Sequence, residues 1–344
     1  MSTQQQPATP PNPVQIFTTI QGYQRAFALK AAVELDLFTA IAKGSQTAAE
    51  IAKACNAAER GIRMLSDSLV VMGFLTKKDN NYSLTPDTAF FLDSRSPAYL
   101  GLAFKFLMDP TQLASFTQLT TAVRNGGSTD EHSTLAPCDP IWIEFAKGMA
   151  PMMMRAAQAM AGILAAELSS RPSAKILDIA ASHGLFGITV AQRLPKAHIY
   201  ALDWANVLEV AKENAGKHGL MDRYHLLPGS AFDVDYGTGF DAILITNLLH
   251  HFEPAANEKM LKKAYTALNP GGQVVILEFV PNDDRVSPPV PAMFSLTMLG
   301  NTPKGDAYTL AEYGSMCRNA GLETPRLIPL EPMPEALVVA RKPF

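Results

Sequence analysis

The second half of the chain alternates between short apolar runs and longer stretches with helical periodicity. From Lys175 onward, six segments have the apolar, β-branched character of buried strands: 175–180, 198–204, 224–230, 241–249, 271–280 and a run within 334–343. Amphipathic stretches of helical spacing lie between most of them, at 183–194, 205–219, 251–268 and 308–321. This alternation predicts an α/β fold with a doubly wound, Rossmann-like and largely parallel sheet. Ligands bind such sheets at the carboxyl ends of the strands, so the residues that follow each strand are candidates for function.

The first hundred residues have a different pattern. Apolar residues recur at helical spacing over 14–41, a capping box at 47–50 opens a short helix, and a further helix is predicted at about 60–72. Two short strands around a polar turn at 79–81 follow, which completes a winged-helix pattern. Such a module binds DNA or holds two chains together. Its last helix is mostly apolar and has few basic residues, so we favour dimerisation over DNA binding.

Residues 98–170 are expected to be helical, apart from a polar loop at 124–140. This segment is rich in methionine. Phe145, Met149 and Met153 are spaced four apart, so they share one face of a helix. Core packing explains such a face most often, and an adaptable apolar wall for a ligand is the sharper alternative.

Composition narrows the possible classes. With 47% hydrophobic and 18% charged residues, the 344-residue chain can bury the cores of two domains. A net charge of −3 without a run of Lys or Arg argues against a nucleic-acid partner. We expect a flexible, Pro-rich tail at 1–13, no signal peptide and no membrane span. Cys55, Cys138 and Cys317 lie far apart without metal-ligand spacing, so we expect a cytoplasmic protein without a metal.

The residues after the first two strands indicate the kind of cofactor. A dinucleotide site needs G-x-G-x-x-G, whereas the nearest positions here are Ala180, Ser182 and Gly184. Asp178 ends the first strand and would repel a pyrophosphate, but it suits a ligand with an ammonium group. Asp203 ends the second strand and can accept hydrogen bonds from both ribose hydroxyls. S-adenosylmethionine has a ribose, an ammonium and a sulfonium but no phosphate, so it fits these acids better than NAD.

Five motifs match the pattern of one known family. D-x-G-x-G-x-G appears as Asp178–Gly184, G-D-M-F as Gly229–Phe232, L-H-D-W as Leu249–Phe252, F-N-x-x-M as Phe145–Met149, and NPGG as Asn269–Gly272. With these motifs the chain resembles the S-adenosylmethionine-dependent small-molecule O-methyltransferases that carry an N-terminal winged-helix dimerisation domain. This is the hydroxyindole and caffeic-acid type, which has bacterial relatives in polyketide and pigment tailoring. The resemblance covers nearly the whole chain after the tail.

The resemblance implies an organisation and a set of roles. It implies a homodimer formed by a dimerisation domain at 14–100, and a methyltransferase domain at 101–344 with a helical segment at 101–170 and a sheet core at 171–344. His250 matches the family's general base, and His251 is a less favoured candidate that we expect to be structural. The residues implied to bind the cofactor are Asp178, Ala180, Ser182, Gly184, Asp203, Trp204, Ser230, Ala231, Phe232 and Asn247.

Several positions depart from the family pattern. Ala180 and Ser182 replace glycines and would be strained where the loop needs a positive φ. Ser230 replaces the acid that contacts adenine, and Thr246 stands where a lysine is expected. Of the two glutamates that flank the histidine in the family, one is replaced by Ala307, and Glu278 precedes the usual position of the other. The sequence therefore predicts weakened carboxylate support for His250.

The function expected from these residues is methyl transfer from S-adenosylmethionine to a hydroxyl of a small aromatic compound. Phe145, Met149, Met153, Phe294 and Met298 are expected to wall the acceptor pocket. The weakened support for the histidine leaves C-, N- or S-methylation open. A regulator that senses S-adenosylmethionine and binds DNA is a further alternative. His183, in the cofactor loop, is expected to pack against the cofactor and not to act in catalysis.

Overall fold

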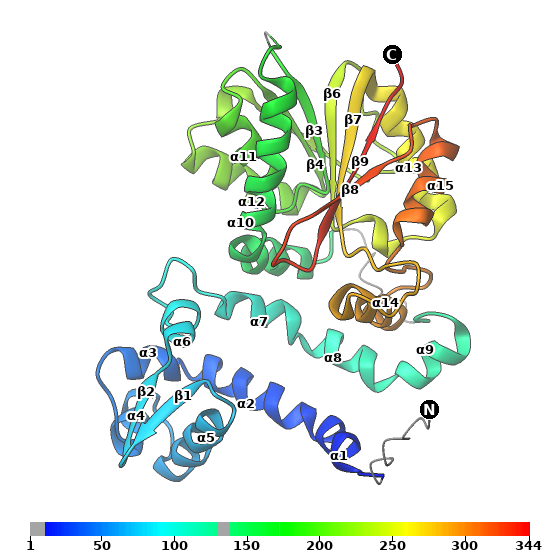
Figure 1. The fold of residues 1–344 in the computed structure, drawn as a ribbon. Helices are drawn as coiled ribbons and strands as arrows, with labels where there is room; N and C mark the ends of the chain where they lie inside the picture. Colours follow the sequence, from blue (N-terminus) through cyan, green and yellow to red (C-terminus); the bar gives the residue numbers. More distant parts are fainter. Residues whose placement is uncertain (1–10, 130–137, 172) are drawn as a thin grey trace, which may run out of the picture. The chain divides into compact units, whose positions relative to one another are not determined.

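The computed structural model describes residues 11–129, 138–171 and 173–344. These residues form two compact units, one ending at Phe104 and one beginning at Lys105 (Figure 1). Most of the expected tail and residues 130–137 of the expected loop lie outside the described residues. No described helix is long and apolar enough to cross a membrane.

The N-terminal unit consists of short helices, a two-stranded hairpin and one further helix. Its elements are α1 (Val14–Ile20), α2 (Gly22–Glu34), α3 (Leu37–Ala42), α4 (Ala48–Ala54), α5 (Glu59–Val71), β1 (Leu75–Lys78), β2 (Asn81–Leu84) and α6 (Pro86–Phe91). The helical run at 14–41 is divided at Gln21 and again between α2 and α3. At the second break, Asp36 adopts a left-handed conformation with φ 53°, which Asp tolerates better than most residues. The predicted capping box of α4 is confirmed, since Thr47 Oγ1 accepts from the Glu50 N–H and Glu50 Oε2 accepts from the Thr47 N–H.

The predicted hairpin is present and is tied to α5. β1 and β2 pair antiparallel from Leu75 opposite Leu84 to Lys78 opposite Asn81. Tyr82 is almost fully buried in the core of this unit and donates its hydroxyl to Asp67 of α5 at 2.7 Å. Two of the few basic side chains near α5 also pair with this aspartate: Arg63 at 3.0 Å and Lys77 at 2.6 Å.

The C-terminal unit is built on one sheet of seven strands over the described residues, in the order β5-β4-β3-β6-β7-β9-β8. The strands are β3 (Lys175–Ile179), β4 (His198–Asp203), β5 (Tyr224–Pro228), β6 (Phe240–Thr246), β7 (Leu268–Glu278), β8 (Arg326–Pro329) and β9 (Ala336–Arg341). β3 to β7 pair parallel, and β9 pairs antiparallel with β7 and β8. The predicted Rossmann-like sheet is confirmed. The edge strand β8 escaped prediction because it has only four residues and no buried position.

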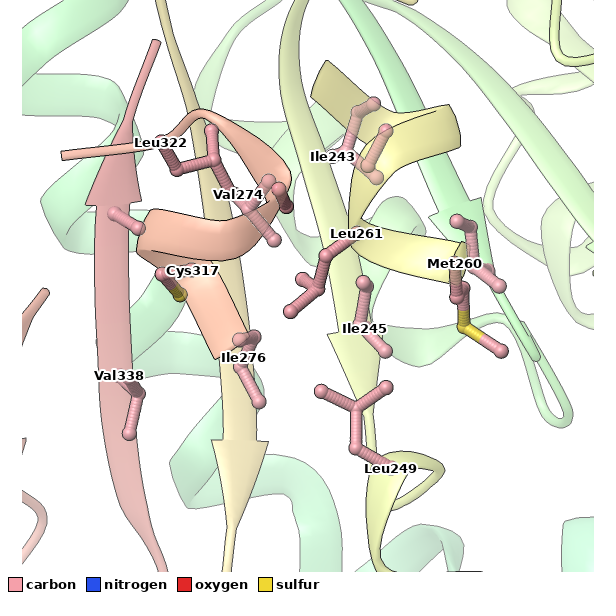
Figure 2. Close-up of a cluster of buried hydrophobic side chains, with 14 of the residues drawn as sticks. Ile243, Ile245, Leu249, Met260, Leu261, Val274, Ile276, Cys317, Leu322 and Val338 are labelled. Carbon is pink, nitrogen blue, oxygen red and sulfur yellow. The ribbon is translucent and has the colours of Figure 1, made fainter. Parts of the chain in front are cut away.

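Helices cover both faces of this sheet (Figure 1). They are α10 (Ile141–Leu168), α11 (Leu185–Arg193) and α12 (Ala205–Lys217) on one face, and α13 (Pro254–Ala267) and α15 (Leu310–Ala320) on the other. Figure 2 shows the second face, where alternate strand residues such as Ile243, Ile245 and Ile276 meet Leu261 of α13 and Cys317 of α15. Each such aliphatic side chain contributes roughly 1.5–3 kcal/mol when it is buried. The packed sheet therefore fixes the strand ends that carry the polar residues.

The remaining helices of the chain precede or interrupt the sheet core. They are α7 (Gly101–Leu107), which crosses the boundary between the units, α8 (Pro110–Thr117), α9 (Leu119–Asn125), α14 (Pro289–Asn301) and the 3₁₀ turns η1 (Met221–Arg223) and η2 (Leu249–His251). α14 contacts α8 and α9. The methionine-rich helix α10 is confirmed as one continuous 28-residue helix. It packs against α11 and α12 and carries aromatic residues to the site described next.

Candidate active site

A cavity lies at the carboxyl ends of four neighbouring parallel strands. Its wall includes residues that directly follow or end β3, β4, β5 and β6, in agreement with the sequence-based expectation. The residues from these strand ends are Ala180, Ser182, Leu202, Asp203, Trp204, Gly229, Ser230, Ala231, Phe232, Thr246, Asn247 and Leu248. The rest of the wall comes from α10, from α11 and the residues just before it, from α12 and from the stretch around η2. The sheet thus gathers side chains that are far apart in the sequence.

In the loop between β3 and α11, the backbone adopts left-handed conformations at the positions where the family pattern has glycines. Ala180 has φ 56° and Ser182 has φ 52°, so the strain expected at these two positions is present. A left-handed conformation costs roughly 1–2 kcal/mol for a residue with a Cβ. Gly184 has no acceptable substitute, because an added Cβ would lie 2.6 Å from the Tyr224 hydroxyl and 3.1 Å from Ala211 Cβ. The loop therefore keeps its conformation with one glycine at the most crowded position.

Two acids lie close to this loop in different positions. Asp203 is on the cavity wall, where Oδ2 accepts from the Ser182 N–H at 2.8 Å and Oδ1 accepts from the Trp204 N–H at 2.7 Å. Asp178 is fully buried and not on the described wall; its Oδ2 accepts from the Gly187 N–H at 3.0 Å, and its Oδ1 has no partner. Burial raises the pKa of Asp178 to about 7 and that of Asp203 to about 6. Both carboxyl groups therefore keep their protons to a higher pH than usual. A cationic ligand nearby would lower their pKa values.

The loop after β5 is held by a lysine that no sequence pattern singled out. Lys263 of α13 donates to the carbonyl oxygens of Ala231 at 3.0 Å, Phe232 at 2.6 Å and Val234 at 2.9 Å. Tyr236 adds its hydroxyl to the Ala231 carbonyl at 2.6 Å. Lys263 thus fixes the backbone of cavity residues without lining the cavity. No local signal distinguishes this lysine from its neighbours on the helix.

His250 has a carboxylate partner, which corrects the expectation of weakened support. Its Nδ1 lies 2.6 Å from Glu278 Oε2, and Glu278 is fully buried. Glu278 Oε1 also accepts from the backbone N–H groups of Leu248 at 3.0 Å and His250 at 3.3 Å. β6 and β7 are adjacent, so the end of β7 brings the acid beside η2 whatever the spacing in the sequence. A lone acid that ends an otherwise apolar strand was the signal for this partner.

The second family glutamate is absent, as expected. Ala307 occupies that position and is fully buried. Asp306 meets His250 only through the backbone, where its N–H donates to the His250 carbonyl at 3.0 Å. The Asp306 side chain instead pairs with Arg285 at 3.1 Å. A single carboxylate, that of Glu278, therefore orients the imidazole among the described residues.

The expected acceptor residues divide into two groups. Phe145 and Met153 line the cavity together with Trp142, Phe252 and His251. Of the described residues, Met149, Phe294 and Met298 lie off that wall. Phe294 instead meets the His250 ring edge-on, with centroids 4.9 Å apart, and stacks on Phe279. His250 is itself off the described wall, and its ring lies 4.3 Å from that of His251, which is on it.

The charges of the wall fit a cationic nucleoside better than a polyphosphate. No Lys or Arg side chain is among the described residues of the wall, so nothing there neutralises a phosphate. Its two histidines are neutral, because burial lowers the pKa of His183 to about 4, and burial next to His250 lowers that of His251 well below its usual value. Asp203 offers carboxylate oxygens at this wall, and Asp178 below the loop can give up its proton when a cationic ligand binds. Over the described residues, no group of His, Cys, Asp and Glu could hold a metal ion.

Comparison with known proteins agrees with this geometry. Residues 144–323 match the O-methyltransferase domain, and residues 17–94 match the O-methyltransferase dimerisation domain. The chain is 28% identical to 3-hydroxy-5-methyl-1-naphthoate 3-O-methyltransferase of Streptomyces sahachiroi, with 93% of each chain covered. It is 26% identical to the tetracenomycin polyketide synthesis 8-O-methyl transferase TcmO of Streptomyces glaucescens, with 96% and 97% covered. A crystal structure of a candidate O-methyltransferase from Nostoc punctiforme is 48% identical, with a TM-score of 0.92 and coverage of 97% of this chain and 100% of that one. The chain therefore belongs to the family of S-adenosylmethionine-dependent O-methyltransferases and is an enzyme with that family's dimerisation domain at residues 17–94.

Proposed function

We propose that the protein transfers the methyl group of S-adenosylmethionine to a hydroxyl of a small, largely apolar aromatic compound, and that His250 takes the hydroxyl proton. One observation supports the proposal above the others: the buried contact between His250 Nδ1 and Glu278 Oε2 at 2.6 Å. A phenol has a pKa near ~10, so a base that removes its proton makes it a better nucleophile at neutral pH.

Glu278 prepares His250 for this role through its hydrogen bond. A carboxylate can only accept, so Nδ1 keeps the imidazole proton and Nε2 presents a lone pair. When Nε2 takes a proton, the resulting cation lies beside the Glu278 carboxylate and is stabilised. His251 lacks this advantage, because burial and the neighbouring His250 lower its pKa and disfavour its charged form. We therefore assign the base to His250, although His251, and not His250, is among the residues of the described cavity wall.

When bound, S-adenosylmethionine supplies a methyl group on a sulfonium, which is a good leaving group. We assign Asp203 to the ribose hydroxyls and Asp178 to the cationic end of the cofactor, acting through space or through water because it is buried. Trp204 and Phe232 give the adenosine apolar walls, and Ser230 replaces the family's acid there. The remaining residues that we assign to the cofactor form the backbone of the loops: Ala180, Ser182, Gly184, Ala231 and Asn247.

The acceptor is assigned to the aromatic end of the cavity. Phe145 and Met153 of α10 form one wall with Trp142, whose ring lies 5.6 Å from that of Phe145. Such a wall excludes water and selects flat, apolar molecules. We assign Phe294 to packing against the His250 ring, and we assign Met149 and Met298 to a supporting layer behind the cavity because both are buried.

We further propose a homodimer formed by residues 14–100. α1 and α2 expose Ile16, Ile20, Tyr23 and Phe27, which recur at helical spacing and form an apolar stripe that a second chain would cover. We keep residues 101–344 as the methyltransferase domain. We propose that nucleic acid is not a partner, because α5 carries few basic residues and two of those near it, Arg63 and Lys77, pair with Asp67. We also propose that the protein acts in the cytoplasm, because Cys55, Cys138 and Cys317 are free thiols, as is usual in a reducing compartment.

The alternatives receive less support from the same residues. C-, N- or S-methylation was open while His250 lacked a carboxylate, and Glu278 removes that argument. A DNA-binding regulator needs a cluster of free basic side chains on α5 or the hairpin. Of the four lysines and arginines there, Arg63 and Lys77 pair with Asp67, which leaves only Arg60 and Lys78. A base held beside a cavity is instead the arrangement expected of a hydroxyl methyltransferase.

The experiment that tests the proposal is a methyl-transfer screen read by mass shift. Phenols, hydroxynaphthalenes and hydroxyindoles are each offered with S-adenosylmethionine, alongside the same compounds with the hydroxyl already methylated. We expect a gain of one methyl group on a hydroxyl compound and none on its methylated counterpart. Equal gain on both members of a pair would show methylation at a carbon or nitrogen atom and overturn the proposal.

A further inference from the structure

His251 is held on the cavity wall without a hydrogen-bond partner for its buried nitrogen. The residue is 9% exposed, and its Nδ1 is buried and unpaired. The neighbouring His250 differs, because Glu278 fixes the proton of that ring on Nδ1. No described residue fixes the proton of His251 in this way. Its ring can therefore present either a donor or an acceptor to a ligand.

The orientation of the His251 ring is nevertheless set. It meets the ring of Trp142 at 90° with centroids 5.5 Å apart, and the ring of His250 at 48° and 4.3 Å. The His251 backbone N–H donates to the Leu248 carbonyl at 3.1 Å, which fixes the main chain. Burial and the neighbouring His250 lower the pKa of His251 well below its usual value. A neutral imidazole in a fixed position is suited to recognise a polar group and poorly suited to take up a proton.

The residues around His251 are mostly apolar, so a polar group of a ligand would find few other hydrogen-bond partners there. Trp142, Phe145, Met153 and Phe252 line the same end of the cavity and offer no strong hydrogen-bonding atom except the indole N–H of Trp142. A buried polar atom that stays unpaired costs roughly 1–3 kcal/mol. A ligand that supplies the missing partner regains that energy, whereas a purely apolar ligand does not.

We propose that His251 is an acceptor-binding residue, which hydrogen-bonds a second polar group next to the hydroxyl that His250 deprotonates. The inference rests on the proposed function, since it needs a hydroxyl at His250. The ring centroids of His250 and His251 lie 4.3 Å apart. The hydroxyl and the second polar group of the acceptor therefore belong on neighbouring ring carbons or on facing positions of fused rings. The substrate class is therefore an aromatic hydroxyl compound with an adjacent hydroxyl, carbonyl or amine.

The test compares two acceptors and three forms of the full chain. 2,3-Dihydroxynaphthalene carries the second group and 2-naphthol lacks it. Binding of each is measured by calorimetry with S-adenosylhomocysteine present, and kcat/KM is measured with S-adenosylmethionine. His251→Phe keeps an aromatic ring against Trp142 but removes both nitrogens. His251→Asn is the second variant, because it restores hydrogen-bonding atoms without the ring.

The wild type is expected to prefer the dihydroxy compound by about 10-fold or more, since sites that hydrogen-bond a ligand reject the analogue without the group. In His251→Phe this ratio should fall to near one, because binding and kcat/KM should fall about 10-fold more for the dihydroxy compound than for 2-naphthol. His251→Asn should recover part of the preference. A wild type that does not bind the dihydroxy compound more tightly would overturn the inference. So would a preference that survives in His251→Phe, or equal losses for both compounds, which would indicate packing alone.

Failure of the proposed function would look different. In that case S-adenosylmethionine would yield no O-methyl product with any hydroxyl compound of the screen, whatever the binding preference. Loss of the binding preference with intact O-methyl transfer would reject only the role of His251.

Discussion

Replacing Glu278 with Gln tests how the base is prepared, because it changes one atom of a buried site. Glu278 accepts three hydrogen bonds, from the Leu248 N–H at 3.0 Å, the His250 N–H at 3.3 Å and His250 Nδ1 at 2.6 Å. The amide oxygen of Gln can still accept from the two backbone groups. Its NH₂ group, however, would face the Nδ1–H of His250, so two donors would meet. The imidazole relieves this by moving its proton to Nε2, where it can no longer act as the base.

The magnitude follows from the worth of a general base. Such a base contributes about 10²–10⁴ in rate, so we expect kcat of Glu278→Gln to fall about 100-fold, or ~2.7 kcal/mol in the barrier. Binding of S-adenosylmethionine should stay within about threefold, because Glu278 is not on the described cavity wall. The assay is steady-state O-methyl transfer, with calorimetry on the same preparation.

A second buried glutamate provides the matched control. Glu335 is 5% exposed and has no hydrogen bond to His250 among the described contacts, although its carboxyl group interacts electrostatically with that of Glu278. Glu335→Gln therefore removes a nearby buried carboxyl group but leaves the hydrogen bonds between Glu278 and His250 in place. This variant should keep kcat within about twofold. The reasoning would be refuted if Glu278→Gln retained wild-type kcat, or if both variants lost activity to the same extent.

Three further predictions concern the cofactor. Burial raises the pKa of Asp178 to about 7, and a cationic ligand should lower it. Binding then releases protons, so affinity for S-adenosylmethionine should rise from pH 5 to pH 7 and level off above; calorimetry in Asp178→Asn should show a flatter profile, and a flat wild-type profile would reject the coupling. Lys263→Met should weaken cofactor binding about 10-fold and leave kcat within about twofold, because three carbonyl contacts are lost. Lys259→Met, at an exposed lysine of the same helix, is the control, and equal effects of the two variants would contradict the proposed role of Lys263 in holding the loop after β5. Ala180→Gly should change the free energy of unfolding by less than about 1 kcal/mol, since relief at φ 56° offsets the flexibility of glycine; chemical denaturation measures this, and a loss above about 2 kcal/mol would show that the methyl group is needed.

The parts of the site that follow from strand order could be predicted from sequence. Asp203, Ser230 and Asn247 each come directly after or at the end of a parallel strand, so the fold must bring them to one edge of the sheet. These strands are short apolar runs between helical stretches, so their ends could be predicted from the sequence. The positive φ values at Ala180 and Ser182 also followed, because the loop must turn there whichever residues it has.

The parts that depend on packing between distant elements could not be predicted in this way. Lys263 reaches three carbonyl groups about 30 residues earlier in the sequence, and its helix shows no pattern that singles it out. The position of Glu278 along the chain does not match that of the family's glutamate, and this mismatch led to the expectation of weakened support for His250. The pairing of β6 with β7, and not the spacing along the chain, brings Glu278 beside His250. Trp142 meets His251 only because α10 lies over the strand ends. Each of these contacts joins elements whose relative placement the local sequence does not encode.

The most direct test of the account is the dependence of His250→Ala on the acidity of the acceptor. Methyl transfer is followed in a single turnover at pH 7, with S-adenosylmethionine bound to the enzyme beforehand and its binding measured in the variant. With a phenol of pKa near ~10, we expect the variant to lose about 100-fold or more in rate. With a nitrophenol, which ionises without help near this pH, the loss should shrink to about 10-fold or less. Equal losses for both acceptors, or no loss for either, would contradict the assignment of His250 as the base.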